Sequence, residues 1–521
     1  MSLAQHYHER TKYDPVTIRQ RGKALDFSQQ PIPYKDYKFG HLINLKQLPA
    51  DLDPNLGERL SRFFYLSYGI TAAVATTGDP YYLRAAPSAG GLYPAELYLI
   101  ARQDSCLPAG LYNYQARPHG LIHFWESNVW SALQSACFWH PVLDHVTLAV
   151  VLTAVFYRSA WRYEDRAYRR IGLDLGHLLG NIELAANLND FRAHLLGGFV
   201  DSALNDLLYL DGDQEAAFVV IGLADLLKVS ENLPHLPTAL PSPVCPTIPK
   251  IAAGDLLHEC HQASQITATD LTYTPKPQAD PDGVVLDLCT GVAIMPPPEP
   301  EPEPEPEPTP DLYDFPGLTR VHLGVEPINW QQNCTGLENT MLRRRSTRVY
   351  SGGSITQAQL AQILDFAYHP EHYQPQGLDE TPDYFCLNLI KTFVAVSEVK
   401  GLEAGCYYYA PQAKELRQIR FKNFRTELHH LSLGQELGRD AAAVVFQTAN
   451  LEAAITELGE RAYRYLHMDA GHLGQRLNLA AMQLNLGASG IAGFFDDQVN
   501  EVLGIPVDDA VLYLTTLGVP A

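Results

Sequence analysis

The chain has 521 residues, of which 46% are hydrophobic, so its length and composition allow two or three well-packed domains. Its 59 acidic side chains outnumber 38 basic ones and give a net charge of −21, which makes nucleic acid and an anionic membrane surface poor partners. The eight cysteines form no Cys-x-x-Cys pair, the N-terminus is polar and no apolar run approaches the length of a membrane span. These features predict a cytoplasmic protein with reduced thiols.

The first half of the chain alternates helical and strand patterns after a polar segment, 1–50, that predicts no element. Apolar spacing predicts a helix at 56–68, a strand at 97–101, a hairpin of 110–114 with 120–124, a strand at 146–156, a helix at 165–187 and a strand at 218–221. A loop of small residues at 87–91 leads into the first strand. Pro87 restricts its backbone, and Gly90-Gly91 permits either an ordinary tight turn or close approach to a flat ligand.

The composition changes between residues 229 and 335, where proline accumulates. Proline recurs from 234 to 249 and from 296 to 310, and Glu alternates with Pro from 299 to 308. The alternating tract predicts an extended polyproline II spacer, because proline fixes φ and the glutamates repel one another. We therefore expect a first domain at 1–228, a proline-rich linker at 229–335 and a second domain at 336–521.

The second domain repeats the first. Residues 165–201 recur at 460–496 without a gap, and the shared pattern runs Arg-Ala-Tyr-Arg, Asp-x-Gly-His-Leu, Leu-Ala-Ala and Gly-Phe-x-Asp. This duplication predicts two copies of one α+β domain that dock as an intramolecular pseudo-dimer.

The two copies have lost different parts. The small-residue loop of the first copy corresponds to Pro382-Asp-Tyr-Phe-Cys386 in the second, whose bulky side chains would block a close ligand. Conversely, the second copy carries Leu342-Arg-Arg-Arg-Ser-Thr-Arg-Val349 ahead of a helix predicted at 359–367, where the first copy has a single lysine within 44–48. Such a cluster offers the forked donors and hydroxyl that fit a phosphate, although arginine clusters also occur on ordinary solvated surfaces.

Together these motifs resemble the FMN-dependent nitroreductase superfamily, and the ordered set is similar to its SagB/ThcOx-type branch, the azoline dehydrogenases of peptide maturation. The resemblance covers about 1–228 and 336–521 and implies a nitroreductase-like fold with FMN between two copies. It implies one complete site and one dead site, hence one flavin per chain. The implied cofactor residues are Arg344, Ser346 and Arg348 at the phosphate, Ala492 and Gly493 beside the flavin, and Pro87, Ser88, Ala89 and Gly90 over its ring.

The resemblance also implies a Lys-Tyr pair for proton abstraction, which corresponds here to Arg162 and Tyr163. Arginine stays protonated and is a poor base, so we expect Tyr163, with its pKa lowered by Arg162, to abstract the proton. The same two residues also fit the start of an amphipathic helix with a packed tyrosine. The implied reaction oxidises a thiazoline or oxazoline in a ribosomally made peptide, with hydride passing to flavin N5 and O2 as the final acceptor.

Two other functions stay open at this point. The same fold serves NAD(P)H-dependent quinone and nitro reductases, and a flavin-free pseudoenzyme could bind a peptide. The implied partners are an azoline-containing peptide and other maturation enzymes, and the sequence leaves open whether the pseudo-dimer pairs again as a homodimer.

Other polar groups receive structural interpretations. We expect no metal site, because His258-Glu-Cys-His261 with Cys245 lacks the paired spacing of zinc ligands. The recurrence of His177 and His472 in both copies favours a shared buried hydrogen bond. The paired arginines 166/169 and 461/464 favour ion pairs on a helix surface.

Overall fold

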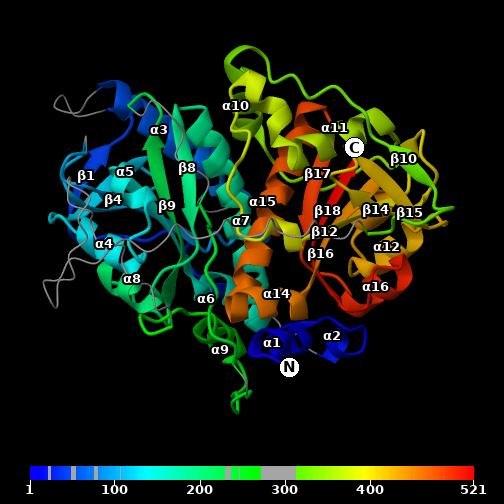
Figure 1. The fold of residues 1–521 in the computed structure, drawn as a ribbon, viewed down its shortest axis with the longest axis horizontal. Coiled ribbons are helices and arrows are strands. Elements are labelled where there is room, and N and C mark those ends of the chain that lie inside the picture. Colours follow the sequence, from blue (N-terminus) through cyan, green and yellow to red (C-terminus); the bar gives the residue numbers. More distant parts are fainter. Residues whose placement is uncertain are drawn as a thin grey trace, which may run out of the picture.

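The structure is a computed structural model that describes residues 1–20, 25–47, 54–75, 80–105, 107–228, 236–245, 247–270 and 312–521. The alternating Glu-Pro tract predicted as a spacer lies outside these residues. Two similar halves lie side by side, with α7 (Ala167–Asn187) and α15 (Ala462–Gln483) between them (Figure 1). No helix in the described part of the chain combines the length and apolar character needed to cross a bilayer.

Each half is built on a seven-stranded antiparallel sheet, and the two sheets have corresponding strand orders: β1-β6-β5-β4-β7-β9-β8 and β10-β15-β14-β12-β16-β18-β17. The first sheet comprises β1 (His41–Asn44), β4 (Ala95–Ala101), β5 (Gly110–Gln115), β6 (Gly120–Trp125), β7 (Leu148–Val155), β8 (Phe191–Leu196) and β9 (Glu215–Asp225). The second comprises β10 (Arg320–His322), β12 (Lys391–Val396), β14 (Gly405–Ala410), β15 (Glu415–Arg420), β16 (Ala443–Asn450), β17 (Gly487–Ile491) and β18 (Asp509–Gly518). The predicted α+β fold in two tandem copies is confirmed.

Helices cover both sheets. In the first half these are α1 (Leu3–Thr11), α2 (Thr17–Gln20), α3 (Pro54–Tyr68), α4 (Trp130–Ala136), α5 (Val142–His145), α6 (Phe156–Tyr163) and α8 (Asp201–Leu207). Further along the chain are α9 (Leu256–Ala263), α10 (Thr335–Arg343), α11 (Gln357–Tyr368), α12 (Arg425–Leu431), α13 (Glu436–Asp440), α14 (Leu451–Leu458) and α16 (Asp496–Leu503). Two small ribbons, β2 (Ile70–Val74) with β3 (Tyr81–Arg84) and β11 (Ile355–Thr356) with β13 (Val399–Lys400), complete the fold.

The two central helices cross at the glycine of the repeated Gly-His pattern. A Cβ on Gly176 of α7 would collide with the backbone carbonyl of Met468, and a Cβ on Gly471 of α15 would collide with that of Leu173. Any side chain at either position would therefore separate the helices. The duplicated glycines allow the close contact that joins the halves.

The end of the expected linker belongs to the second half. Strand β10 pairs with β15 at the edge of the second sheet, and the side chain of Trp330 is completely buried against Phe366 of α11. The sequence placed these residues in the linker because the preceding proline run hides the boundary. The second half therefore begins before residue 336.

Helix α9, also within the expected linker, is the structural counterpart of α1, and the two lie together below the central helices (Figure 1). Arg169 donates to the carbonyl of His8 and Arg464 donates to that of His261. In the same way, Nε of Arg169 bonds to the hydroxyl of Thr11, and Nε of Arg464 to that of Ser264. The duplicated unit thus begins with a helix, which is α1 in the first copy and α9 in the second. Helix α1 lies in the segment 1–50, for which no element was predicted.

Each docked helix covers a buried ion-pair cluster that crosses between the halves. Arg166 and Arg169 lie 2.9 and 2.6 Å from the carboxylate of Asp496. Burial alone would raise the pKa of Asp496, but the two guanidinium groups outweigh it and hold that pKa below its ordinary value. These arginines were expected on a helix surface, and the structure places them in the interface instead.

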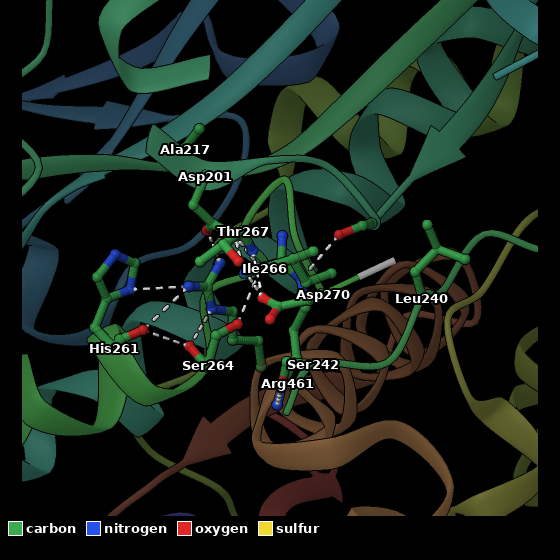
Figure 2. Close-up of polar contacts among 12 residues, drawn as sticks. Asp201, Ala217, Leu240, Ser242, His261, Ser264, Ile266, Thr267, Asp270 and Arg461 are labelled. Atoms are coloured by element: carbon green, nitrogen blue, oxygen red, sulfur yellow. Dashed lines mark hydrogen bonds and ion pairs between the residues drawn. The ribbon is translucent and has the colours of Figure 1, made fainter. Parts of the chain in front are cut away.

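The second cluster has the same arrangement around Asp201. Arg461 and Arg464 lie 2.6 and 2.9 Å from its carboxylate, which also accepts the N–H of Ile266 at 2.9 Å. Figure 2 shows Arg461, Ser264 and Ile266 gathered around Asp201. The two halves are therefore locked by matching buried charges, each pairing an arginine pair of one copy with an aspartate of the other.

Candidate functional site

A cavity of about 110 Å³ lies between the two halves and takes its wall from both. Its wall includes every predicted cofactor residue except Arg344 and Gly493. The first copy contributes Pro87, Ser88, Ala89, Gly90, Arg170, Leu173, Asp174 and His177, and the second contributes Ser346, Arg348, Asn478, Gly490, Ala492 and Tyr513.

Asp174 of α7 holds the small-residue loop over this cavity. Its carboxylate accepts the hydroxyl of Ser88 at 2.6 Å and the backbone N–H of Ala89 at 2.9 Å. The Ser88 hydroxyl in turn accepts the N–H of Tyr93 at 2.8 Å. Gly90 has φ +63°, and a Cβ there would lie 2.8 Å from the hydroxyl of Tyr163, so glycine is required.

The sequence did not predict this role for Asp174, although its recurrence as Asp469 was a usable signal. In the second copy Asp469 accepts the N–H groups of Phe385 and Cys386, at the corresponding place in the other loop. Burial raises the pKa of both aspartates to about 7, against the opposing effect of the hydrogen bonds that they accept. Both copies therefore use the same buried carboxyl to anchor a loop.

Arg344 lies beside the cavity, behind its wall. Its Nε donates to the carbonyl of Ala85 at 2.6 Å, which ties the second copy to the segment that leads into the loop of the first. Its Nη1 is buried and makes no hydrogen bond within the residues described. Burial lowers the pKa of Arg344 to about 10, with a smaller contribution from Arg345 and Arg348 and against the opposing effect of Tyr93. This guanidinium is thus a charged donor available to an anion.

The other members of the arginine cluster separate. Ser346 and the exposed Arg348 line the cavity, whereas Nη1 of Arg345 turns back to the carbonyl of Leu342 at 3.4 Å. The N–H of Thr347 bonds to the carbonyl of Ala488 at 2.9 Å and fixes the segment against β17. Two members of the predicted phosphate cluster, Ser346 and Arg348, therefore line the cavity, Arg344 lies beside it and Arg345 lies apart.

Arg170 is a cavity residue that the sequence interpretation missed. Its guanidinium lies 3.9 Å from the ring centre of Tyr163, and its Nη2 lies 3.5 Å from the hydroxyl of Tyr13. Its Nη1 is buried and has no hydrogen-bond partner in the described chain. Comparison of the two copies could have revealed it, because position 170 is one of the places where they differ: Tyr465 occupies the matching position in the second copy. A second unsatisfied charged donor therefore faces this cavity.

Tyr163 lies against the loop at Gly90, but its pKa shifts in the opposite direction from the one expected. Burial raises the pKa of Tyr163, and the nearby guanidinium groups of Arg170 and Arg162 only partly oppose this effect. Arg162 itself is exposed, with its guanidinium 5.7 Å from the ring centre. The phenol is therefore protonated at neutral pH.

The counterpart of the cavity in the other half is filled by the chain itself. Tyr384 stacks on His472 with ring centres 4.4 Å apart, and Phe385 stacks on Tyr465 at 4.9 Å. The segment 236–245, which we call the strap, covers the remaining face. There the N–H of Gly197 bonds to the carbonyl of Thr238 at 2.6 Å.

The strap marks the clearest difference between the two sites. Ala492 is the counterpart of Gly197, and its N–H makes no backbone hydrogen bond to another described residue. A Cβ on Gly198 would collide with the side chain of Leu240 of the strap, whereas at the corresponding Gly493 the nearest atom would be 3.2 Å away, on Leu433. One site thus presents an available amide, and the other has its amide occupied.

The two recurrent histidines differ more than expected. His177 lies 3.0 Å from Oε1 of Gln475 and 2.8 Å from the hydroxyl of Tyr513, so its buried hydrogen bonds are present. His472 instead stacks on Tyr384 and lies 3.6 Å from Glu183. Burial lowers the pKa of both imidazoles.

The segment His258-Glu-Cys-His261, where no metal site is expected, has an arginine beside one of its histidines. Nδ1 of His261 lies 3.3 Å from Nη2 of Arg464.

Comparison with known proteins defines the class. The profile of the Nitroreductase family matches residues 68–224 and 341–519, so the chain belongs to the Nitroreductase family. Proteins of this family are in general flavin-binding oxidoreductases. The whole chain is similar to a crystal structure described as a putative nitroreductase from Anabaena variabilis ATCC 29413, with 56% identity, 100% coverage of both chains and a TM-score of 0.90.

Two curated relatives match one part of the chain each. The putative nitroreductase MJ1384 of Methanocaldococcus jannaschii is 31% identical over 169 residues, which are 32% of this chain and 84% of the relative. The trifolitoxin-processing protein TfxB of Rhizobium leguminosarum bv. trifolii is 31% identical over 153 residues, which are 28% of this chain and 40% of that protein.

Proposed function

We propose that the chain is an FMN-dependent oxidoreductase that oxidises thiazoline or oxazoline rings of a ribosomally made peptide to thiazole or oxazole rings. The observation that carries the proposal is a cavity between the copies, whose wall combines the small loop of the first with Ser346 and Arg348 of the second. The similarity to TfxB, a protein named for toxin processing, supports a peptide as the substrate.

The residues around the cavity fit FMN. The free Nη1 of Arg344 together with Ser346 and Arg348 would hold the phosphate, since guanidinium and hydroxyl groups bind it by charge-assisted hydrogen bonds. The available amide of Ala492 and the neighbouring Gly493 would lie beside the ring, and the loop 87–90 would cover it. Ligand pockets of this kind hold roughly 300–1,000 Å³. The cavity of about 110 Å³ is smaller than this, so flavin binding requires side chains of its wall to move.

When bound, FMN supplies a two-electron acceptor for the hydride that leaves the azoline ring, and O2 is the proposed final oxidant. The protein must supply a base for the proton that leaves the adjacent carbon. We assign this role to Tyr163, with Arg162 and Arg170 as the cations that favour its phenolate. Because burial keeps the phenol protonated at neutral pH, Tyr163 must lose its proton before it can accept one from the substrate.

Flavin content tests this proposal. The purified chain, saturated with FMN and freed of excess, should release close to one FMN per polypeptide and should convert an azoline peptide to the azole with a mass loss of two hydrogens. A ratio near two would contradict the closed second site. A ratio near zero would favour the flavin-free peptide-binding function.

The similarity to proteins described as nitroreductases favours one alternative, an NAD(P)H-dependent quinone or nitro reductase. Rapid anaerobic bleaching of the bound flavin by NADH or NADPH, with slow or no bleaching by an azoline peptide, would support that function. The reverse pattern would support azoline oxidation.

A further inference from the structure

Away from the cavity, three side chains with metal-ligand atoms converge directly after α11. His369, Glu371 and His372 each offer one such atom, and the three atoms lie within 4.8 Å of one another. Across the described ranges no other group of three His, Cys, Asp or Glu side chains meets this condition. His369 is buried and Glu371 is exposed, so the cluster opens to solvent on one side. We propose that these three residues bind a divalent zinc ion.

The orientation of His372 favours metal binding. Its Nδ1 lies 2.8 Å from Oδ1 of Asp365, a buried carboxylate whose other oxygen accepts the hydroxyl of Tyr373 at 2.9 Å. Nδ1 therefore carries the proton and donates it to Asp365, which leaves the lone pair of Nε2 directed at the cluster. A carboxylate that orients a ligating histidine in this manner is a regular feature of zinc sites.

His369 is held in a similar way. Its Nε2 lies 3.2 Å from the hydroxyl of Tyr409 on β14, and its Nδ1 lies 3.1 Å from Oε1 of Glu371. One ring nitrogen is thus anchored to the second sheet, and the other points at the shared carboxylate. When Nδ1 binds a metal, the remaining N–H can be donated to Tyr409, so ligation leaves no buried ring nitrogen unsatisfied.

A cation already lies against this cluster. Nζ of Lys414, at the turn between β14 and β15, lies 2.9 Å from Nε2 of His372. Because an ammonium group can only donate, the Nε2 lone pair already accepts from a positive charge. Asp365 and Glu371 give the cluster two negative charges against this single one. The flexible lysine can therefore swing out when a divalent ion takes its place.

The donor set selects the metal. Two imidazole nitrogens and one carboxylate, with a fourth position for water, match zinc, whereas Ca²⁺ and Mg²⁺ prefer oxygen ligands alone. The ligands come from one short segment at the end of α11, and their supporting groups come from α11 and β14. The ion would therefore fix the turn that follows α11, and it has no part in the proposed oxidation.

Zinc titration of the intact chain tests the proposal. After treatment with EDTA and its removal, isothermal titration calorimetry with ZnCl2 should reveal one site of micromolar or tighter affinity, and Co²⁺ should give the visible bands of a tetrahedral complex. His372→Ala and Glu371→Gln should each weaken zinc binding at least tenfold, whereas Lys414→Met should keep or tighten it. His429→Ala, a histidine in a surface pair with Glu436, is the matched control and should change nothing.

Circular dichroism spectra that match the wild type would show that each variant is folded. The proposal is wrong if the wild-type chain takes up no zinc, or if folded His372→Ala and Glu371→Gln bind zinc as tightly as the wild type does. Tighter binding by Lys414→Met would be hard to reconcile with loose surface association, because that variant removes the cation that the ion must displace.

Discussion

Asp174 of α7 and Ser88 of the cavity loop are joined by a 2.6 Å hydrogen bond, which makes the central helix the support of the loop. The same helix packs on α15 of the other copy, and Arg169 within it and Arg166 directly before it both bind Asp496. The loop, the interface and the buried charges of the first copy therefore depend on one element. Four testable predictions follow from this arrangement and from the proposed function.

Asp174→Asn should flatten the pH dependence of stability and weaken flavin binding. Burial raises the pKa of Asp174 to about 7, well above its ordinary value of 3.8, so the folded chain holds this proton more tightly than the unfolded chain does. The contribution of this group to the free energy of unfolding therefore falls as pH rises from about 4 to about 7. Denaturation at several pH values should reveal the difference.

Asp469→Asn is the matched control, because Asp469 has the same raised pKa and anchors the loop of the closed site. It should flatten the stability profile to a similar degree and leave FMN affinity unchanged. Equal losses of FMN affinity in the two variants would contradict the assignment of one working site.

Asp496→Ala and Asp201→Ala should each destabilise the chain by about 3–5 kcal/mol, because each leaves two buried guanidinium groups without their carboxylate. Urea denaturation checks this. Only Asp496→Ala should also reduce FMN affinity, since Asp496 accepts the N–H of Tyr13 and pairs with Arg166, which donates to the carbonyl of Ala492. Similar stability loss with different flavin affinity is the expected signature.

Arg344→Ala should weaken FMN binding by roughly 10- to 100-fold, which corresponds to about 1.5–3 kcal/mol for the loss of charge-assisted hydrogen bonds. Fluorescence titration with FMN measures this. Arg345→Ala is its control, because Arg345 points to the backbone carbonyl of Leu342. If both variants bound FMN like the wild type, phosphate recognition by this cluster would be disproved.

Tyr163→Phe should abolish most azoline oxidation while FMN affinity changes little. In the wild type the rate should rise with pH across the alkaline range, because burial raises the pKa of Tyr163 and its phenolate forms only there. A pH–rate profile of single-turnover flavin reduction checks the direction. A profile without an alkaline rise, or a Phe variant of full activity, would assign the proton transfer to another group.

Much of the fold could be predicted because it is written in local patterns. The β-branched, apolar run at 146–156 and the helical spacing of 165–187 anticipate β7 and α7 within a few residues. The gapless repeat then predicts that whatever fold one copy adopts, the other shares. The boundaries of the linker could not be predicted in this way, because the sequences of the matching helices there are too different to reveal the repeat. Over the matching helices α1 and α9 only Leu3 with Leu256 and His8 with His261 are identical, and backbone carbonyls provide the key contacts.

The same division applies to the site. Each copy retains a motif that the other has lost, at 87–91 in the first and at 342–349 in the second, and this difference in the sequence predicts one composite cavity. The direction of the pKa shift of Tyr163 cannot be seen in the sequence. Burial depends on what packs against the ring, and here its effect on the pKa outweighs that of the neighbouring charges.

By itself, then, the sequence determined the duplicated fold and the residues that can meet between the copies, since both follow from local periodicity and from comparing the halves. Only the tertiary structure decided that the paired arginines are buried, that the strap closes the second site, that Arg170 faces the first, and that His369, Glu371 and His372 share one point. The first three relations depend on contacts between segments distant in the chain, and the cluster after α11 depends on how its histidines bond to Asp365 and Tyr409. No local pattern specifies the burial and distances that create them.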